Sequence, residues 1–138
     1  MKTSRVKLIC DTGVISRAYS NFENFKSIIE DLSIKYEICI TTTIKIELYR
    51  WIYDYKSKVG LKTFNAILKS INSLPVIKLD RKVCDVAEKL TIKHHQSGVG
   101  DLLTAAVSID KKVKLFTINY KDFKTIPRIN LYLPPHFQ

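Results

Sequence analysis

Two hydrophobic patterns alternate along the chain. Short runs rich in apolar and β-branched residues, typical of buried parallel strands, occupy residues 6–10, 37–41, 75–79 and 113–117, with a further candidate at 130–133. Between these runs, apolar residues recur three or four positions apart, as in a helix with one buried face. These helical stripes cover residues 22–32, 44–55, 61–71, 83–90 and 102–109. The alternation predicts an α/β domain with a central, mostly parallel sheet of four to five strands flanked by helices.

The chain is predicted to form one domain over residues 1–138. No Gly/Ser-rich linker, repeat or low-complexity tract interrupts the alternation, and 138 residues suit a single hydrophobic core. No apolar run reaches the roughly 18 residues of a membrane-spanning helix, and the first predicted strand begins too early for a signal peptide. We therefore expect a cytoplasmic protein with no membrane partner.

The three cysteines agree with this compartment. Cys10, Cys39 and Cys84 are odd in number, far apart, and each lies in an apolar segment. Disulfide frameworks and zinc sites favour paired, closely spaced cysteines and histidines. We expect all three thiols to be small core side chains.

Basic residues outnumber acidic ones by 23 to 13, which gives a formal charge of +10. A field of this sign attracts polyanions, and phosphate contacts by Lys and Arg supply most non-specific affinity for nucleic acids. Charge alone leaves two interpretations open: a nucleic-acid-binding protein, or a basic surface without a specific partner.

Three acids lie in apolar surroundings, where carboxylates are costly. Asp11 directly follows the first predicted strand, Glu47 borders the stripe of residues 44–55, and Asp101 precedes the apolar helix of residues 102–109. An ionised carboxylate in such a setting costs several kcal/mol unless a cation or hydrogen bonds compensate it. In open α/β sheets, ligands bind outside the carboxyl ends of the strands. We expect these acids to converge on a divalent metal ion.

Each acid also has a purely structural interpretation. Asp11 is suited to a turn or helix cap, although the following Thr12 and Gly13 offer a hydroxyl and a close approach of the backbone to a ligand. Glu47 is equally suited to an ion pair with a neighbouring Lys or Arg. Asp101, after two glycines, is suited to the N-cap of the helix that follows.

The order of these segments resembles the PIN-domain family, and within it the VapC-type ribonuclease toxins of toxin–antitoxin pairs. The resemblance covers nearly the whole chain. It rests on the strand ending at Asp11 and on residues 42–48 (TTIKIEL), 100–106 (GDLLTAA) and 117–123 (TINYKDF).

The resemblance implies a Rossmann-like sandwich in which acids gather around Mg²⁺ or Mn²⁺ and cleave RNA, leaving a 5′-phosphate and a 3′-hydroxyl. Asp11, Glu47 and Asp101 match the three acids, as catalytic residues and metal ligands. Asn119 falls where many members place a fourth Asp, and Asp122 is a candidate for the missing charge. The implied partners are a structured RNA such as tRNA, a cognate antitoxin, and a second copy of the chain in a homodimer.

Other residues are candidates for RNA contacts. Two sets lie in or just after the segment that contains Glu47: the basic residues Lys45, Arg50, Lys56 and Lys58, and the aromatic residues Tyr49, Trp51 and Tyr53. The first set suits a solvated helix face as well as phosphate binding, and the spacing of Trp51 favours the core over base stacking. The aromatic run also suits contacts with an antitoxin or a second copy.

Two other functions fit parts of the pattern. Asn119 in place of an acid favours a catalytically silent PIN-like module that binds RNA or protein. Asp11 alone suits a receiver-like phosphoacceptor domain, although the basic charge and the late Asp101 argue against it. His94 continues the stripe of residues 83–90, which favours a partly buried histidine over a metal ligand.

Overall fold

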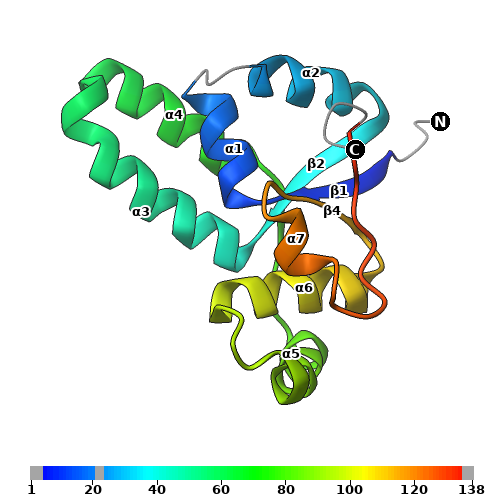
Figure 1. Ribbon diagram of the computed structural model, residues 1–138. Helices are drawn as coiled ribbons and strands as arrows, with labels where there is room; N and C mark the ends of the chain where they lie inside the picture. The colour runs from blue at the N-terminus through cyan, green and yellow to red at the C-terminus, as the bar shows by residue number, and fades with distance from the viewer. Residues whose placement is uncertain (1–4, 21–23, 135–138) are drawn as a thin grey trace.

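The computed structural model describes residues 5–20 and 24–134. Four strands and seven helices follow one another in this part of the chain (Figure 1). Their order is β1 Val6–Cys10, α1 Thr12–Tyr19, α2 Phe25–Lys35, β2 Tyr36–Thr41, α3 Thr42–Val59, α4 Leu61–Ser73, β3 Val76–Ile77, α5 Arg81–His94, α6 Val99–Lys111, β4 Lys114–Phe116 and α7 Tyr120–Phe123.

The four strands form one parallel sheet in the order β3-β2-β1-β4. The predicted fold class is therefore confirmed. The third strand is shorter than the predicted residues 75–79. The candidate strand at 130–133 forms only a bridge: Leu131 pairs with Leu115, and the Leu115 N–H donates to the Asn130 carbonyl at 2.9 Å.

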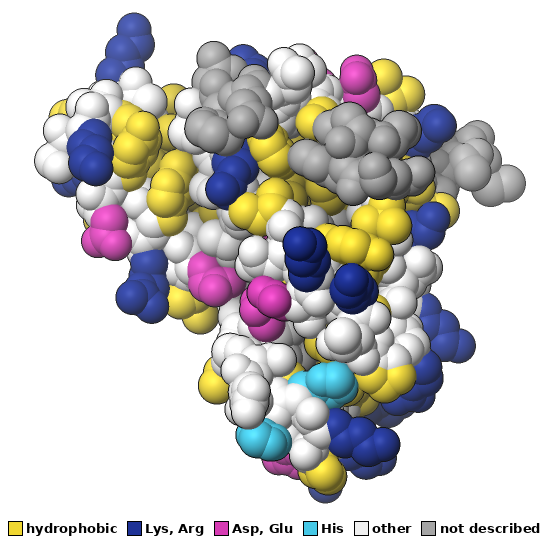
Figure 2. Space-filling model, viewed as in Figure 1, with side chains coloured by type: hydrophobic (Ala, Val, Ile, Leu, Met, Phe, Trp, Pro, Cys, Tyr) yellow, Lys and Arg dark blue, Asp and Glu magenta, His cyan; other side chains and the backbone are white. Residues whose placement is uncertain are grey.

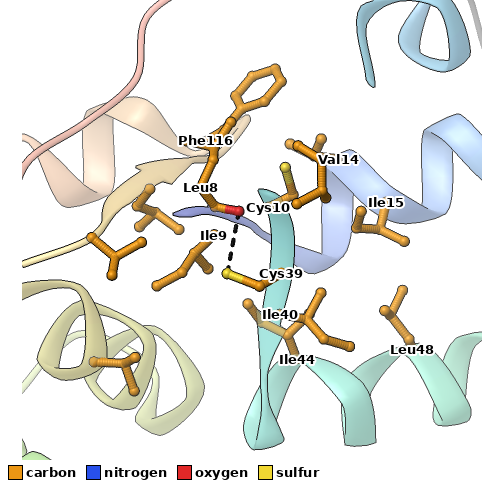
Figure 3. Close-up of a cluster of buried hydrophobic side chains, with 14 of the residues drawn as sticks. Leu8, Ile9, Cys10, Val14, Ile15, Cys39, Ile40, Ile44, Leu48 and Phe116 are labelled. Atoms are coloured by element: carbon orange, nitrogen blue, oxygen red, sulfur yellow. Dashed lines mark hydrogen bonds between the residues drawn. The ribbon is translucent and has the colours of Figure 1, made fainter. Parts of the chain in front are cut away.

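Helices cover both faces of the sheet (Figure 1). Helices α1 and α2 and the α3–α4 hairpin lie on one side, and α5 packed against α6 lies on the other. The core between these layers is apolar: side chains of β1 and β2, including Leu8, Ile9 and Ile40, meet those of α1 and α3 (Figure 3). Burial of this apolar surface is the main force that stabilises the fold.

Two of the predicted cysteine positions are confirmed and one is wrong. Cys10 and Cys39 are buried, and the Cys39 thiol donates to the Leu8 carbonyl at 3.4 Å (Figure 3). Cys84 is exposed, because the helical period of α5 turns Val83 and Ala87 inward and leaves the residue after Val83 outside. All three thiols are free.

Helix starts follow from side-chain caps. The Thr41 hydroxyl accepts from the Ile44 N–H at 3.1 Å, and the Asp80 carboxylate accepts from the Val83 N–H at 2.9 Å. Helix α6, however, begins at Val99 with Gly98 as its N-cap. The prediction that Asp101 caps this helix is therefore wrong; Asp101 lies within its first turn.

Other differences concern single positions. The stripe predicted to begin at Leu61 is shifted, because that side chain is exposed and Ile67 is buried with Phe64 on the inner face of α4. Phe22, at the start of the second stripe, lies outside the described residues. Within the described ranges, no helix combines the length and apolar character needed to cross a membrane.

Candidate functional site

Asp11 occupies the carboxyl end of β1, and the sheet register explains its neighbours. Cys10 pairs with Phe116 of β4, so the residues that follow, Asp11 and Thr117, are adjacent at the same edge. The Asp11 carboxylate accepts from the Thr12 N–H at 2.8 Å through Oδ1 and from the Thr117 hydroxyl at 2.9 Å through Oδ2. Asp11 is only 6% exposed. It both caps α1, as the structural interpretation held, and presents a fixed, buried carboxylate.

Burial raises the pKa of Asp11, while the hydrogen bonds from Thr117 and Thr12 oppose that rise. Desolvation disfavours the charged form of an acid, and hydrogen bonds donated to the carboxylate favour it. In the part of the chain described, no Lys, Arg or His forms an ion pair with Asp11. Two hydrogen bonds therefore compensate only part of the cost of this buried charge.

Glu47 is half-buried on α3 and is linked to Asp11 through one residue. The Thr12 hydroxyl donates to Glu47 Oε1 at 2.7 Å, while the Thr12 N–H donates to Asp11. The alternative that Glu47 pairs with a Lys or Arg is not found among residues 5–20 and 24–134. Thr12 thus orients two acids that are 36 residues apart in sequence.

Asp101 is the electrostatic centre of the cluster. Its pKa is raised to about 6, first by burial and then by repulsion from Asp11, Glu47 and Asp122. A shift of this kind requires the four carboxylates to lie within electrostatic range. The structure therefore brings together acids from the end of β1 and from α3, α6 and α7.

Gly100 lets the first turn of α6 approach α3. A Cβ built at this position would lie 3.2 Å from Glu47 Oε2 and 3.6 Å from Thr43 Cγ2. Any larger residue would push against the Glu47 carboxylate. The absence of a side chain at Gly100 therefore leaves room for the Glu47 carboxylate.

The last two candidates, Asn119 and Asp122, lie together but differ in role. Both are exposed, and the Asp122 N–H donates to the Asn119 carbonyl at 2.9 Å in the short helix α7. Asp122 contributes to the raised pKa of Asp101. Asn119 is linked to the site through its backbone, because its N–H donates to the Thr117 hydroxyl at 3.0 Å.

Thr117 was not singled out by sequence reasoning, and it is the residue that joins the two halves of the site. Its buried hydroxyl donates to Asp11 and accepts from Asn119, so it fixes the acid and the turn before α7 together. The available signal was its position: it is the first polar residue after an apolar strand. Thr12 carries the same signal one residue after Asp11.

Two neighbouring cavities open on this region. One, of about 360 Å³, is lined by Asp101, Asp122, Lys121 and the turn at residues 96–98. A larger one, of about 660 Å³, shares Lys121 and Asp122 with it and extends toward α1 and α2. On the face shown in Figure 2, acidic side chains lie near the middle with Lys and Arg side chains on both sides.

The donor set suits a hard divalent cation, although the side chains are not gathered into a finished cage. Among residues 5–20 and 24–134, no three His, Cys, Asp or Glu side chains are close enough together to hold a metal ion as they stand. The available donors are carboxylate oxygens, the ligands that Mg²⁺ and Mn²⁺ prefer. Asp11 is fixed by hydrogen bonds from two sides, and Glu47 and Asp101 are half-buried. The residues present therefore fit such an ion.

The remaining candidates lie along α3 and α5. Trp51 is half-buried and stacks on Tyr55, with ring centroids 5.7 Å apart, while Tyr53 is 57% exposed. Arg50, Lys56 and Lys58 are exposed and Lys45 and Tyr49 are half-buried; His94 is also half-buried. The structure places Trp51 against the core as expected and leaves Tyr53 accessible.

Comparisons with known proteins agree with one another. A family model described as PIN domain matches residues 8–129. Among solved structures, a chain of VapBC2 from Rickettsia felis, bound to a DNA fragment from its promoter, is 23% identical over 92% of this chain and 98% of its own, with a TM-score of 0.78. VapBC-1 from nontypeable Haemophilus influenzae is 18% identical over 92% and 97%, with a TM-score of 0.74. DNA-bound VapBC from Salmonella typhimurium is 19% identical over 92% and 97%, with a TM-score of 0.72. A comparison with curated protein sequences finds no significant match.

Proposed function

The chain belongs to the PIN domain family, and from this premise we propose that it is a metal-dependent endoribonuclease, the toxin of a type II toxin–antitoxin pair. PIN domains are generally nucleases, so the family supports hydrolysis of a nucleic acid. The observation that carries the proposal is the cluster of Asp11, Glu47, Asp101 and Asp122, in which the other three acids repel Asp101 and no described Lys, Arg or His forms an ion pair with any of the four.

Asp11, Glu47 and Asp101 are the proposed metal ligands, and Asn119 or Asp122 completes the set. Clustered carboxylates are stable together when a divalent cation neutralises them. Because burial and mutual repulsion raise the pKa of Asp101 to about 6, and burial raises that of Asp11, the cluster favours a positive charge in its centre. When bound, Mg²⁺ or Mn²⁺ would lower the pKa of a water molecule and stabilise negative charge on the phosphate oxygens.

The protein side chains would orient the reaction. We propose that Glu47, whose carboxylate accepts from the Thr12 hydroxyl, either ligates the metal or accepts a hydrogen bond from the attacking water. In hydrolysis the water oxygen bonds to phosphorus, the bond from phosphorus to the 3′ oxygen breaks, and the 3′ oxygen takes a proton. The products of this cleavage are a 5′-phosphate and a 3′-hydroxyl.

RNA is the proposed substrate because the surface is strongly basic, with a formal charge of +10 despite the acidic centre. Exposed Arg50, Lys56 and Lys58 on α3 are candidates for phosphate contacts, with Lys45 half-buried on the same helix. Two of these lysines also lie over aromatic rings: Lys56 Nζ is 4.9 Å from the Phe64 ring centre and Lys45 Nζ 5.9 Å from that of Tyr49. A structured RNA such as tRNA fits this charge.

An antitoxin and a second copy of the chain are the proposed protein partners. The similar chains come from VapBC complexes, among them the DNA-bound complexes of Rickettsia felis and Salmonella typhimurium. The aromatic residues of α3 from Tyr49 to Tyr55 offer a contact surface for either partner, because Tyr53 is exposed and Trp51 and Tyr55 are partly so. The function is proposed for the cytoplasm.

Cleavage of RNA by the purified protein tests the proposal directly. We expect cleavage of transfer RNA with Mg²⁺ or Mn²⁺, no cleavage with EDTA, and 5′-phosphate ends on the products. Asp101→Asn, purified in parallel to control for contaminating ribonucleases, should lower the rate at least about 100-fold. No cleavage by the wild-type protein, or equal rates for the variant, would contradict the proposal.

A catalytically silent RNA- or protein-binding module is the second candidate, and the observation that favours it is Asn119 at the fourth position. An amide adds no negative charge and holds a cation less strongly than a carboxylate. RNA bound tightly but left intact with Mg²⁺ and Mn²⁺ would favour this candidate. Replacing the amide, in Asn119→Asp, should then produce cleavage.

A further inference from the structure

The larger of the two cavities, about 660 Å³, extends beyond the acids and has no assigned ligand in the proposed chemistry. Its walls come from α1, α2, the segment after β4 and the segment at residues 132–134. The volume falls within the range of about 300–1,000 Å³ that is usual for binding sites of small organic groups. It adjoins the acids, because Asp122 and Lys121 line both cavities.

The walls combine flat apolar groups with a few charged ones. Of the apolar lining residues, Ile118 and Tyr120 are each 37% exposed, and Phe25 is buried. Tyr132 is held in place by edge-on contacts with Phe116, at 5.5 Å, and with Tyr36, at 5.9 Å, between ring centres. A wall that is already rigid loses little conformational entropy when a ligand binds.

Arg17 gives the cavity a planar cation. Its guanidinium lies 5.9 Å from the centre of the Phe25 ring, and its Nη1 donates to the Gly13 carbonyl at 3.1 Å. Guanidinium planes stack on nucleobases as aromatic rings do, and they also attract phosphate. Lys121 places a second positive charge between this cavity and the acids.

We infer that this cavity binds one unpaired nucleobase of the RNA chain, next to the phosphodiester at the acid cluster, with Tyr120 as the stacking residue. The inference rests on the proposed function for its choice of RNA. Recognition of single-stranded RNA typically stacks bases on aromatic side chains or Arg planes beside a basic path for the backbone. Tyr120, Arg17 and Lys121 supply these parts within one cavity. A peptide would also fit apolar walls, but the two cations flanking the cavity favour a polyanion.

Binding of a short, fluorescein-labelled single-stranded RNA, measured by anisotropy in EDTA, tests the site without cleavage. Loss of one stacked base should weaken binding about 5- to 100-fold. When an abasic nucleotide replaces the stacked one in the RNA, the wild-type protein should therefore bind it about 5- to 100-fold more weakly. In Tyr120→Leu, which keeps the apolar volume, the intact RNA should bind weaker by a similar factor, and the abasic nucleotide should cost nothing more.

Three further variants make the assignment specific. Tyr120→Phe should bind like the wild type, because the ring is kept and only the hydroxyl is lost. Ile92→Ala, which changes a residue on α5 that is 76% exposed, should also leave binding unchanged. Tyr53→Ala tests the competing platform on α3: if this variant, and not Tyr120→Leu, removes the effect of the abasic nucleotide, the inference is wrong.

Photo-crosslinking of the unmodified protein supports the same test should Tyr120→Leu unfold. RNA carrying 4-thiouridine should crosslink to residues 117–122, and crosslinks confined to α3 or α5 would overturn the inference. The inference would also be overturned if Tyr120→Leu bound RNA as tightly as the wild type does. It would be overturned as well if that variant lost only the binding of a protein partner. Because the readout is binding in EDTA, a protein that stacks the base but cuts no RNA would overturn the proposed nuclease and leave this site standing.

Discussion

Acidic residues form two clusters in this protein, and the clusters hold their charge in opposite ways. Where α5 begins and α6 ends, Lys111 forms ion pairs with Asp80 and with Asp110, the latter at 3.3 Å. The hydrogen bond from Lys111 lowers the pKa of Asp80, and the Val83 N–H adds to this. At the carboxyl ends of β1 and β4, burial and mutual repulsion instead raise the pKa of Asp101 and burial raises that of Asp11.

The difference separates a cluster whose charge is compensated within the chain from one whose charge is not. The Asp80 cluster is complete within the chain, because each carboxylate accepts from a lysine and Asp80 also caps α5. No described Lys, Arg or His forms an ion pair with the acids of the Asp11 cluster, and the cluster opens on a cavity. An arrangement that costs free energy and is not compensated by the chain is typical of a site whose partner comes from outside.

The largest expected effect comes from removing one charge from each cluster. Asp11→Asn should lower the rate of RNA cleavage by at least about 100-fold, more than the roughly 10- to 100-fold typical of residues that only support a ligand. In EDTA the same variant should be no less stable than the wild type, because a buried carboxylate with a raised pKa is replaced by a neutral amide. Rates are measured on RNA with Mg²⁺, and stability by urea unfolding.

Asp80→Asn is the matched control for Asp11→Asn. It should leave the cleavage rate unchanged and lower the free energy of unfolding, because the ion pair with Lys111 is lost. If the two variants behaved alike in both measurements, the distinction between the clusters would fail.

A smaller effect is expected at Thr117, which touches the acid but not the proposed metal. Thr117→Val keeps the shape of the side chain and removes the hydrogen bond to Asp11 Oδ2. Cleavage should fall about 10- to 100-fold and the apparent affinity for Mn²⁺ should fall with it. Because a buried carboxylate loses a hydrogen-bond donor, the free energy of unfolding should fall by about 1–3 kcal/mol.

Thr117→Ser separates positioning from packing. It restores the hydroxyl without the methyl group, so Mn²⁺ affinity should return close to the wild-type value. If Thr117→Val kept the wild-type affinity for Mn²⁺ and Thr117→Ser lost it, Thr117 would act through packing alone.

Much of this fold was predictable from the sequence because its signals are local. The runs in β1 and β2 and the stripes of α3 and α5 repeat with the periods of strand and helix. Helix α1 was not among the predicted stripes, because its eight residues hold only three buried positions, Val14, Ile15 and Ala18. Helix α6 begins earlier than predicted, because Gly98 rather than Asp101 is its N-cap. Cys84 shows that an apolar neighbourhood in sequence does not fix which side of a helix is buried.

The candidate site was predictable only as a set of residues. Asp11, Glu47 and Asp101 were singled out by their apolar surroundings, and Asp122 by its place in the last motif. Their common location depends on the pairing of β1 with β4, which brings Asp11 beside a threonine 106 positions away. The roles of Thr12 and Gly100 also arise from contacts with α3 that no local pattern encodes. Such long-range contacts follow from strand order and helix packing, which the sequence pattern alone leaves open.

The smallest effect expected is the pH dependence of stability, which should have opposite signs in the two clusters. The folded-state pKa of Asp101, about 6, lies above its ordinary value of 3.8, so the folded protein holds its proton more strongly. Stability from this group is therefore greatest below about pH 4 and is lost as the pH rises through about 6. Asp80, with a lowered pKa, contributes stability above its ordinary pKa that is lost only at lower pH.

We propose to compare urea unfolding of the wild type and Asp101→Asn in EDTA, at about pH 5 and about pH 7.5. The comparison isolates the contribution of Asp101 to the free energy of unfolding. Since Asp101 is only half-buried, screening by solvent should limit the difference between the two proteins to about 1 kcal/mol. The wild type should lose more stability than Asp101→Asn over this interval, because only the wild type carries the Asp101 carboxyl. At about pH 7.5, saturating Mn²⁺ should make the wild type the more stable of the two proteins. The ion binds only the folded carboxylates, and at this pH protons no longer compete with it for them. If Asp101→Asn followed the wild-type curve with and without Mn²⁺, Asp101 would be as inert as an ordinary surface acid, and the contrast between the two clusters would rest on Asp11 alone.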